Sequence, residues 1–206
     1  MSKRALIIVD IQNDFCPGGA LAVKEGDQII PVINGLQNKF DLVVATQDWH
    51  PQNHGSFASN HPGKNIYDLI DLNGVQQVLW PDHCVQGTKG AELVENLNTE
   101  KIARIFKKGM NSKVDSYSGF FDNGGKNPSG LEHFLRKKKI TEVYICGLAL
   151  DYCVMFTALD SRKLGFQTSV ILEACRGVES KPGDCARTIT NMVQNGIHCV
   201  IQAKNV

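Results

Sequence analysis

Residues 143–154 of the chain read VYICGLALDYCV. The first four form a short apolar, β-rich run, which predicts a buried strand. The segment 153–164 carries apolar residues at helical spacing and is followed by Gly165, which predicts a helix that ends there. We therefore expect Cys153 at a strand-to-helix turn.

Cys153 is the residue of this stretch with the most reactive side chain. At the first turn of a helix, unpaired backbone N–H groups and the helix dipole stabilise a thiolate, which predicts a lowered pKa for the Cys153 thiol. Taken alone, however, a cysteine in such a place is more often a buried structural residue. The choice between the two interpretations depends on the residues that the rest of the chain brings to the same place.

Length and charge exclude several classes of protein. At 206 residues the chain is long enough for one well-cored domain, which we expect to span residues 1–206. The formal net charge of +1 gives no indication of nucleic acid or of an anionic membrane as a partner. The longest apolar runs, 5–9 and 42–45, have the length of strands and not of membrane spans.

The first residues and the cysteines indicate a cytoplasmic protein. Residues 1–4 lead directly into an apolar strand, without the features of a signal peptide. The chain has seven cysteines, an odd number, and no C-x-x-C pair. Reduced thiols in a cytoplasm fit this usage best. Homo-oligomerisation stays open, because nothing in the sequence decides it.

Apolar runs alternate with segments of helical periodicity along the whole chain. This alternation predicts an α/β fold, with a doubly wound, mostly parallel six-stranded sheet in a single domain and helices on both faces. The expected strands are 5–9, 41–46, 101–106, 143–146, 168–172 and 198–202. The expected helices are 27–39, 90–97, 131–139, 153–164 and 182–194. We expect 55–78 to be mostly loop and the polar segment 111–127 to be a loop that closes over a site.

Four chemically active side chains follow four of the expected strands: Asp10, Asp48, Lys108 and Cys153. The carboxyl ends of parallel strands meet at one edge of a sheet, where α/β proteins bind their ligands. A carboxylate and an ammonium beside a cysteine indicate a nucleophile with a base and an electrostatic partner. Each residue alone has a plainer interpretation, such as an aspartate in a turn or a lysine at a solvated strand end. Only the four together favour a site.

A metal site is predicted at the same edge of the sheet. Asp48 and His50 form an Asp-x-His pair, whose side chains can converge on one divalent ion, and His83 is the third candidate ligand. His54 is a further candidate, either as a ligand or as a residue that orients one. His61 fits a surface histidine better. An Asp/His/His site suits zinc, iron or manganese.

These residues lie in sequence blocks that resemble a known family. The blocks are ALIIVDIQNDFCPGG (5–19), QDWHP (47–51), WPDHCV (80–85), KG (108–109), YS (117–118) and DYCV (151–154). Their combination resembles the bacterial nicotinamidases of the isochorismatase-like, or cysteine amidohydrolase, superfamily, nearly from end to end. The resemblance implies an isochorismatase-like fold and a metal-dependent hydrolysis of nicotinamide to nicotinate and ammonia through a thioester. It also implies pyrazinamide as a second substrate.

The resemblance further assigns roles to individual residues. Asp10, Lys108 and Cys153 would be the catalytic triad. Asp48, His50 and His83 would bind one divalent metal ion per subunit, zinc in the first place with iron or manganese as alternatives.

The remaining implied roles concern the substrate. Phe15 and Trp80 would sandwich the pyridine ring. The backbone N–H groups of Ala149 and Cys153 would form the oxyanion hole, with a cis peptide bond between Leu148 and Ala149. Only a small-molecule substrate is implied as a partner.

One position departs from the family pattern, and two other functions stay open. The family has Thr where this chain has Leu150, so a hydroxyl is absent from the turn that carries Cys153. One alternative is a related isochorismatase-like amidohydrolase that acts on another small amide. The other is a metal-binding protein without catalytic activity.

Overall fold

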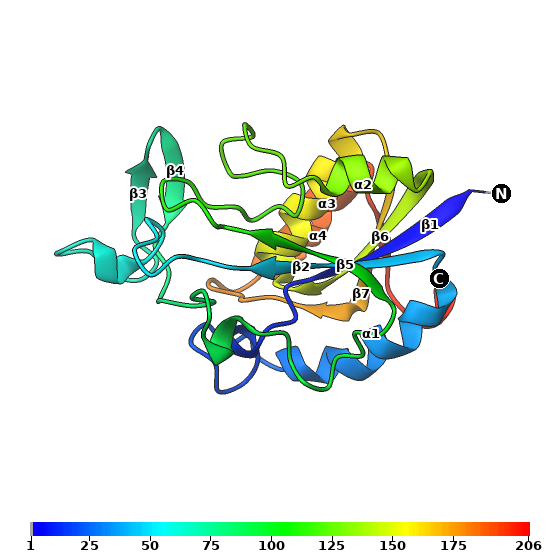
Figure 1. Ribbon diagram of the computed structural model, residues 1–206, viewed down its shortest axis with the longest axis horizontal. Helices are drawn as coiled ribbons and strands as arrows, with labels where there is room; N and C mark the ends of the chain where they lie inside the picture. Colours follow the sequence, from blue (N-terminus) through cyan, green and yellow to red (C-terminus); the bar gives the residue numbers. More distant parts are fainter. Residues whose placement is uncertain (1) are drawn as a thin grey trace.

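The computed structural model describes residues 2–206 and contains a central six-stranded sheet. Its strands lie in the order β5-β2-β1-β6-β7-β8, and every neighbouring pair is parallel (Figure 1). The strands of this sheet are β1 (Lys3–Val9), β2 (Leu42–Asp48), β5 (Ile102–Lys108), β6 (Ile140–Leu148), β7 (Gln167–Arg176) and β8 (His198–Val200). The helices are α1 (Ile30–Leu36), α2 (Leu131–Lys137), α3 (Met155–Lys163) and α4 (Asp184–Gln194).

The helices cover both faces of the sheet. Helix α1 lies on one face, and α2, α3 and α4 lie on the other (Figure 1). The face on which each helix lies follows from the direction in which the chain moves along the sheet, because β-crossover-β connections are right-handed. The doubly wound α/β fold predicted from the sequence is therefore confirmed.

The central strands are buried on both faces, which explains their uniformly apolar sequence. In β1 every residue from Ala5 to Val9 has no exposed surface. Its neighbours in the sheet are β2 on one side and β6 on the other. The core is thus continuous through the middle of the sheet, and the polar residues begin where these strands end.

The winding direction of the sheet reverses between β1 and β6. From β1 the chain passes to β2 and β5 on one side, and later to β6, β7 and β8 on the other. A crevice forms at the carboxyl ends of the strands on either side of such a reversal. Asp10 follows β1 directly, and the β2–β5 register pairs Asp48 with Lys108, the last residue of each strand. The fold therefore delivers these side chains to one place.

The segment 55–78 is mostly loop, as expected, but it also contains a hairpin that the sequence analysis did not predict. Strands β3 (Leu69–Leu72) and β4 (Val75–Val78) pair antiparallel and extend away from the central sheet (Figure 1). Their two-residue turn is Asn73-Gly74, and both residues have positive φ, 54° and 83°. Asn-Gly is the preferred sequence for such a turn, because it tolerates this backbone.

The helix expected over 90–97 is also absent. Only a short 3₁₀ turn, Lys89–Ala91, forms there. Residues 92–94 then pair with the loop that follows β1, where the amide of Val94 donates to the carbonyl of Ile11 and the amide of Asn13 donates to the carbonyl of Glu92, and residues 94–97 form a turn. Tertiary pairing with the 11–13 loop therefore overrides the local preference for helix.

The turn after β6 is more elaborate than a simple helix start. Residues Leu150–Val154 form one π-helical turn, and α3 begins at Met155. Cys153 lies inside the π turn, a feature that is frequent at functional sites.

Among residues 2–206, no helix is long and apolar enough to cross a membrane.

Candidate active site

Lys108 is the centre of a buried cluster of charges. Its ammonium lies 2.8 Å from Oδ2 of Asp10 and 2.5 Å from Oδ1 of Asp48. It also donates to the backbone carbonyl of Ser116 (3.0 Å) and contacts Sγ of Cys153 (3.4 Å). The structure thus brings together the four residues that the strand ends predicted.

The two carboxylates of this cluster have opposite acid–base properties. Burial, together with the charge of Asp48, raises the pKa of Asp10 to about 6, although Lys108 opposes the shift. Burial would also raise the pKa of Asp48, but Lys108 and His50 outweigh it and hold this pKa well below its usual range. Two acids whose pKa values are pushed apart are typical of sites that use one of them as a proton carrier.

The predicted lowering of the Cys153 pKa was wrong. Burial raises the pKa of this thiol well above its ordinary value, and the carboxylates of Asp10 and Asp48 add to the shift. Only Lys108 lowers it. The helix terminus is thus outweighed by the loss of water around the sulfur. Cys153 therefore rests as a thiol and requires a base.

Backbone and side-chain contacts fix the two aspartates. Asp10 has a positive φ of 49°, which is uncommon for a residue other than glycine, and its Oδ1 accepts a hydrogen bond from the Thr46 hydroxyl (2.6 Å). Asp48 is held through its main chain. The Gln12 side chain donates to the Asp48 carbonyl and accepts from the Asp48 amide, both at 2.8 Å. Gln12, which lies in the block after β1, therefore holds the end of β2 in place beside Asp10.

Three buried histidines each have one anchored ring nitrogen. Nδ1 of His50 bonds to the Gly109 carbonyl (2.9 Å) and Nδ1 of His83 to the Pro81 carbonyl (2.8 Å). Nδ1 of His54 bonds to the Ser56 hydroxyl (2.7 Å). The edges of all three rings pack around Phe57, with centroid distances of 5.5–5.6 Å. The anchored nitrogen fixes each ring and leaves Nε2 for another partner.

Gly109 is required beside His50. It has a φ of 66°, and a Cβ at this position would collide with the imidazole. Because glycine has no side chain and tolerates this backbone, the chain can turn at once after Lys108 and offer its carbonyl to the ring.

The histidines and Asp48 fit a divalent cation. One ligand atom each from Asp48, His50 and His83 lie within 4.8 Å of one another. Nε2 of His50 and Nε2 of His54 are buried and have no hydrogen-bond partner. Burial lowers the pKa of His83 to about 4, so its ring is neutral, as a metal ligand must be. Burial would lower the pKa of His50, but Asp48 outweighs it and raises this pKa, so an ion would displace a proton from this ring. Two imidazoles with one carboxylate are a donor set for zinc and similar ions.

The reactive groups open into a small apolar cavity of about 30 Å³. Phe15 and Trp80, which the sequence placed against the substrate ring, both line it. Ala149 and Cys153 line it as well, and the Leu148–Ala149 peptide bond is cis, as expected. This space is smaller than that of most ligand pockets.

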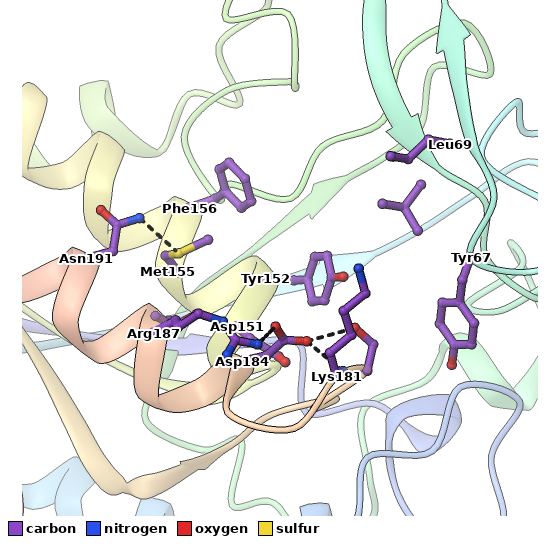
Figure 2. A pocket seen from close by; sticks show the side chains of 13 residues that line it. Tyr67, Leu69, Asp151, Tyr152, Met155, Phe156, Lys181, Asp184, Arg187 and Asn191 are labelled. Atoms are coloured by element: carbon purple, nitrogen blue, oxygen red, sulfur yellow. Dashed lines mark hydrogen bonds and ion pairs between the residues drawn. The ribbon is translucent and has the colours of Figure 1, made fainter.

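A larger groove of about 540 Å³ lies outside this cavity, between the β3–β4 hairpin and helices α3 and α4 (Figure 2). Tyr152 lines both spaces, and its ring packs edge-on against Trp80 with centroids 4.8 Å apart. Asp184 bonds there to Arg187 and to the Lys181 amide (Figure 2). The reactive groups face the small cavity, so the larger groove is its approach and not the centre of the chemistry.

The turn that carries Cys153 is held by the residue that follows Leu150. The carboxylate of the next residue, Asp151, accepts the backbone amides of Val178 (2.9 Å) and Glu179 (2.8 Å). Val178 also lines the small cavity. These bonds tie the nucleophile turn to the loop after β7, while Leu150 is buried in the apolar core.

Several residues of the site were missed at the sequence level. Asp115 is buried, lines the small cavity and forms a group with His50 and His54. Asp14 accepts the Cys84 amide (2.7 Å) and so fixes the chain beside His83. Only their positions in the sequence could have indicated these two residues, because Asp14 lies in the block after β1 and Asp115 lies in the polar segment 111–127. His61 is only partly buried and bonds to the Gly55 carbonyl, away from the cluster.

The chain belongs to the isochorismatase family. A family model described as "Isochorismatase domain" matches residues 4–203. Several similar proteins are named nicotinamidase. The nicotinamidase of Escherichia coli (strain K12) is 50% identical over 200 residues, which are 95% of this chain and 93% of that protein.

Two solved structures support the same placement. A nicotinamidase/pyrazinamidase from Acinetobacter baumanii has a TM-score of 0.95 at 45% identity and covers 100% of this chain and 98% of its own. A pyrazinamidase of Pyrococcus horikoshii, solved in complex with zinc, has a TM-score of 0.79 at 41% identity, with coverages of 97% and 99%.

Proposed function

We propose that this protein is a nicotinamidase that also hydrolyses pyrazinamide, with Cys153 as nucleophile, Asp10 as proton carrier and Lys108 as their electrostatic partner. The relationship to nicotinamidases over nearly the whole chain supports the activity. The observation that carries the mechanism is the buried ammonium of Lys108, which contacts Asp10, Asp48 and Cys153 together.

The first half of the reaction forms a thioester. Asp10 takes the proton of the Cys153 thiol, whose raised pKa makes this base necessary. The thiolate attacks the carboxamide carbon, and the N–H groups of Ala149 and Cys153 stabilise the oxyanion, each by about 3–4 kcal/mol. Asp10 then returns the proton to the amide nitrogen, which leaves as ammonia.

The second half releases the acid. Asp10 removes a proton from water, the hydroxide attacks the thioester carbon, and the carbon–sulfur bond breaks. The nicotinic acid that forms leaves as nicotinate after it loses its proton to water, and the proton held by Asp10 returns to the sulfur. A pKa of about 6 suits both directions of transfer near neutral pH. Lys108 keeps a positive charge beside whichever of the two groups is negative.

Asp48, His50 and His83 would hold a divalent cation, for which zinc is the first candidate and iron or manganese the alternatives. Such an ion would bind the ring nitrogen of the substrate and thereby place the carboxamide over the sulfur. Phe15 and Trp80 would then hold the faces of the ring, and Tyr117 and Tyr152 close the cavity around it.

Ring specificity tests this assignment. Nicotinamide and pyrazinamide carry a ring nitrogen meta to the carboxamide, whereas benzamide has none. We expect a kcat/KM for benzamide about a hundredfold lower, since small misplacements of a reacting group have effects of this size. His83→Ala should lower activity and shrink the difference. Ammonia release from the three amides, with and without a chelator, is the measurement.

The outcomes separate the competing functions. Equal rates for benzamide and nicotinamide would contradict the cation's positioning role. Hydrolysis of a different small amide only would favour a related amidohydrolase. Absence of ammonia release from every amide, with normal cation binding, would leave a metal-binding protein without catalytic activity.

A further inference from the structure

A buried carboxylate outside the proposed ligand set faces the same histidines. Asp115 lies in the segment between β5 and α2 and is 3% exposed. One ligand atom each from His50, His54 and Asp115 lie within 4.8 Å of one another. His50 therefore belongs to two groups, the first with Asp48 and His83 and the second with His54 and Asp115.

The protein itself satisfies Asp115 only in part. Its Oδ1 accepts the Ser116 amide (2.7 Å), and its Oδ2 accepts the side-chain amide of Gln77 at the longer distance of 3.2 Å. None of the ion pairs formed within residues 2–206 includes it. A buried carboxylate without a cationic partner is destabilising, so its place beside the histidines calls for a positive charge.

His54 points to the same conclusion. Its side chain is fully buried, Nδ1 is held by Ser56, and Nε2 has no partner. Because Nδ1 of His50 is taken by Gly109, only Nε2 of His50 is available to an ion, and one ion must serve both groups. Asp115 and His54 thus share His50 with Asp48 and His83, and Asp115 lines the same small cavity as those two ligands.

The charges of the site require a third carboxylate. Lys108 and a divalent cation together bring three positive charges into a buried site. Asp10 and Asp48 supply two negative charges, and both are already in contact with Lys108. Asp115 supplies the third, and it forms no ion pair with the ammonium of Lys108.

We propose that Asp115 is a positioning residue of the cation site. With His54, it accepts or shares hydrogen bonds with water ligands in the coordination positions that Asp48, His50 and His83 leave open, and its charge balances the ion. Groups that act on a metal through its ligands commonly change its affinity by about 10- to 100-fold. This inference rests on the proposed cation site but not on the hydrolysis of an amide.

The test measures cation affinity without substrate. Metal-free wild type and Asp115→Asn are titrated with Zn²⁺ in competition with a chelator, and with Co²⁺ followed by its visible absorption. We expect Asp115→Asn to bind both ions about 10- to 100-fold more weakly. The cobalt spectrum should keep its shape, since the three direct ligands are unchanged. His54→Gln is a second variant on the same side and should also weaken binding.

Two controls separate this role from a structural one. Asp122→Asn removes a carboxylate from the same segment, but Asp122 bonds to Asn127 and Lys126 and lies outside both histidine groups, so affinity should not change. Gln77→Ala removes the bond that ties Asp115 to β4 and keeps the carboxylate. It should lower the unfolding temperature of the metal-free protein and should leave the affinity for the cation close to that of wild type.

Each outcome decides the matter. Wild-type affinity in Asp115→Asn, or an equal loss in Gln77→Ala, would overturn the inference. A changed cobalt spectrum in Asp115→Asn would overturn the water-mediated contact, because it would mean that Asp115 is itself a ligand. Wild type that binds no divalent cation would instead overturn the proposed cation site, which is a separate failure.

Discussion

Two clusters of oppositely charged side chains differ mainly in their contact with water. Lys108 lies 2.8 Å from Asp10, and Arg187 lies 2.6 Å from Asp184 on the wall of the outer groove. The side chains of the first pair are 2% and 0% exposed, whereas those of the second are 61% and 25% exposed. Water screens the second pair, so its geometry contributes little to stability.

Burial therefore makes the first cluster reactive, and the distances alone do not. Without water, each charge depends on its neighbours, and the pKa values of Asp10, Asp48 and Cys153 all move. Ion pairs of similar length thus have different consequences. The following predictions test that difference.

The largest effect is expected at the nucleophile. Cys153→Ala should lower kcat/KM by about 10⁴-fold or more, because loss of a nucleophile removes the whole covalent route. Circular dichroism and zinc content should stay as in wild type. Cys199→Ala on β8 is the control and should keep full activity. Substantial amide hydrolysis by Cys153→Ala would rule the thioester out.

The next effect concerns the buried ammonium. Lys108→Met leaves Asp10 and Asp48 buried without their cation, so the free energy of unfolding should fall by about 3–5 kcal/mol and the rate by about a hundredfold. Denaturant unfolding and steady-state kinetics measure the two. Lys107→Met is the matched control, because Lys107 is exposed over the Trp49 ring. A stronger effect at Lys107 would place the functional lysine one residue earlier.

The pH profile should show the shifted acid directly. Asp10 acts as a base only when ionised, so log kcat/KM should be level above pH 6 and fall by about one per pH unit below it. Lys108 lowers the pKa of Asp10, and Lys108→Met should therefore move this acidic limb to higher pH. A limb that stays near pH 4 in both proteins would mean that burial does not control Asp10.

The smallest effect is expected in the exposed pair. Arg187→Met should leave activity and unfolding temperature within error of wild type, because a solvated ion pair loses little when it is broken. The change is of the same type as Lys108→Met, so the two variants form a direct comparison. A large loss in Arg187→Met would show that the groove supports the active cavity.

The sequence predicted the residues of the site better than their environment. The strand ends could be predicted because uniformly apolar runs stop at Asp10 and Asp48, and parallel topology then brings such ends together. The pKa of Cys153 could not be predicted, because it depends on how much water the folded protein excludes from the sulfur. Asp115 was passed over because the segment 111–127 has no periodicity that fixes the direction of a side chain.

Two differences between the expected and the observed fold have different causes. The hairpin at 69–78 was predictable from Asn73-Gly74 between two short apolar runs, which is a strong local signal. The helix at 90–97 was not predictable in the same way. Residues 92–94 are held by bonds to Ile11 and Asn13, which are some eighty residues away in the sequence.

The raised pKa of Cys153 affects how easily this residue is oxidised. Peroxides and electrophiles attack thiolates, and exposed thiolates are the first to be lost to sulfenic and sulfinic acids. A thiol that is 6% exposed and protonated at rest offers these reagents very little. In the proposed mechanism, Asp10 deprotonates this thiol only during turnover, when substrate fills the cavity and shields the sulfur. Such an enzyme would lose activity to oxidation only slowly, and fast alkylation would be a poor marker of its active cysteine.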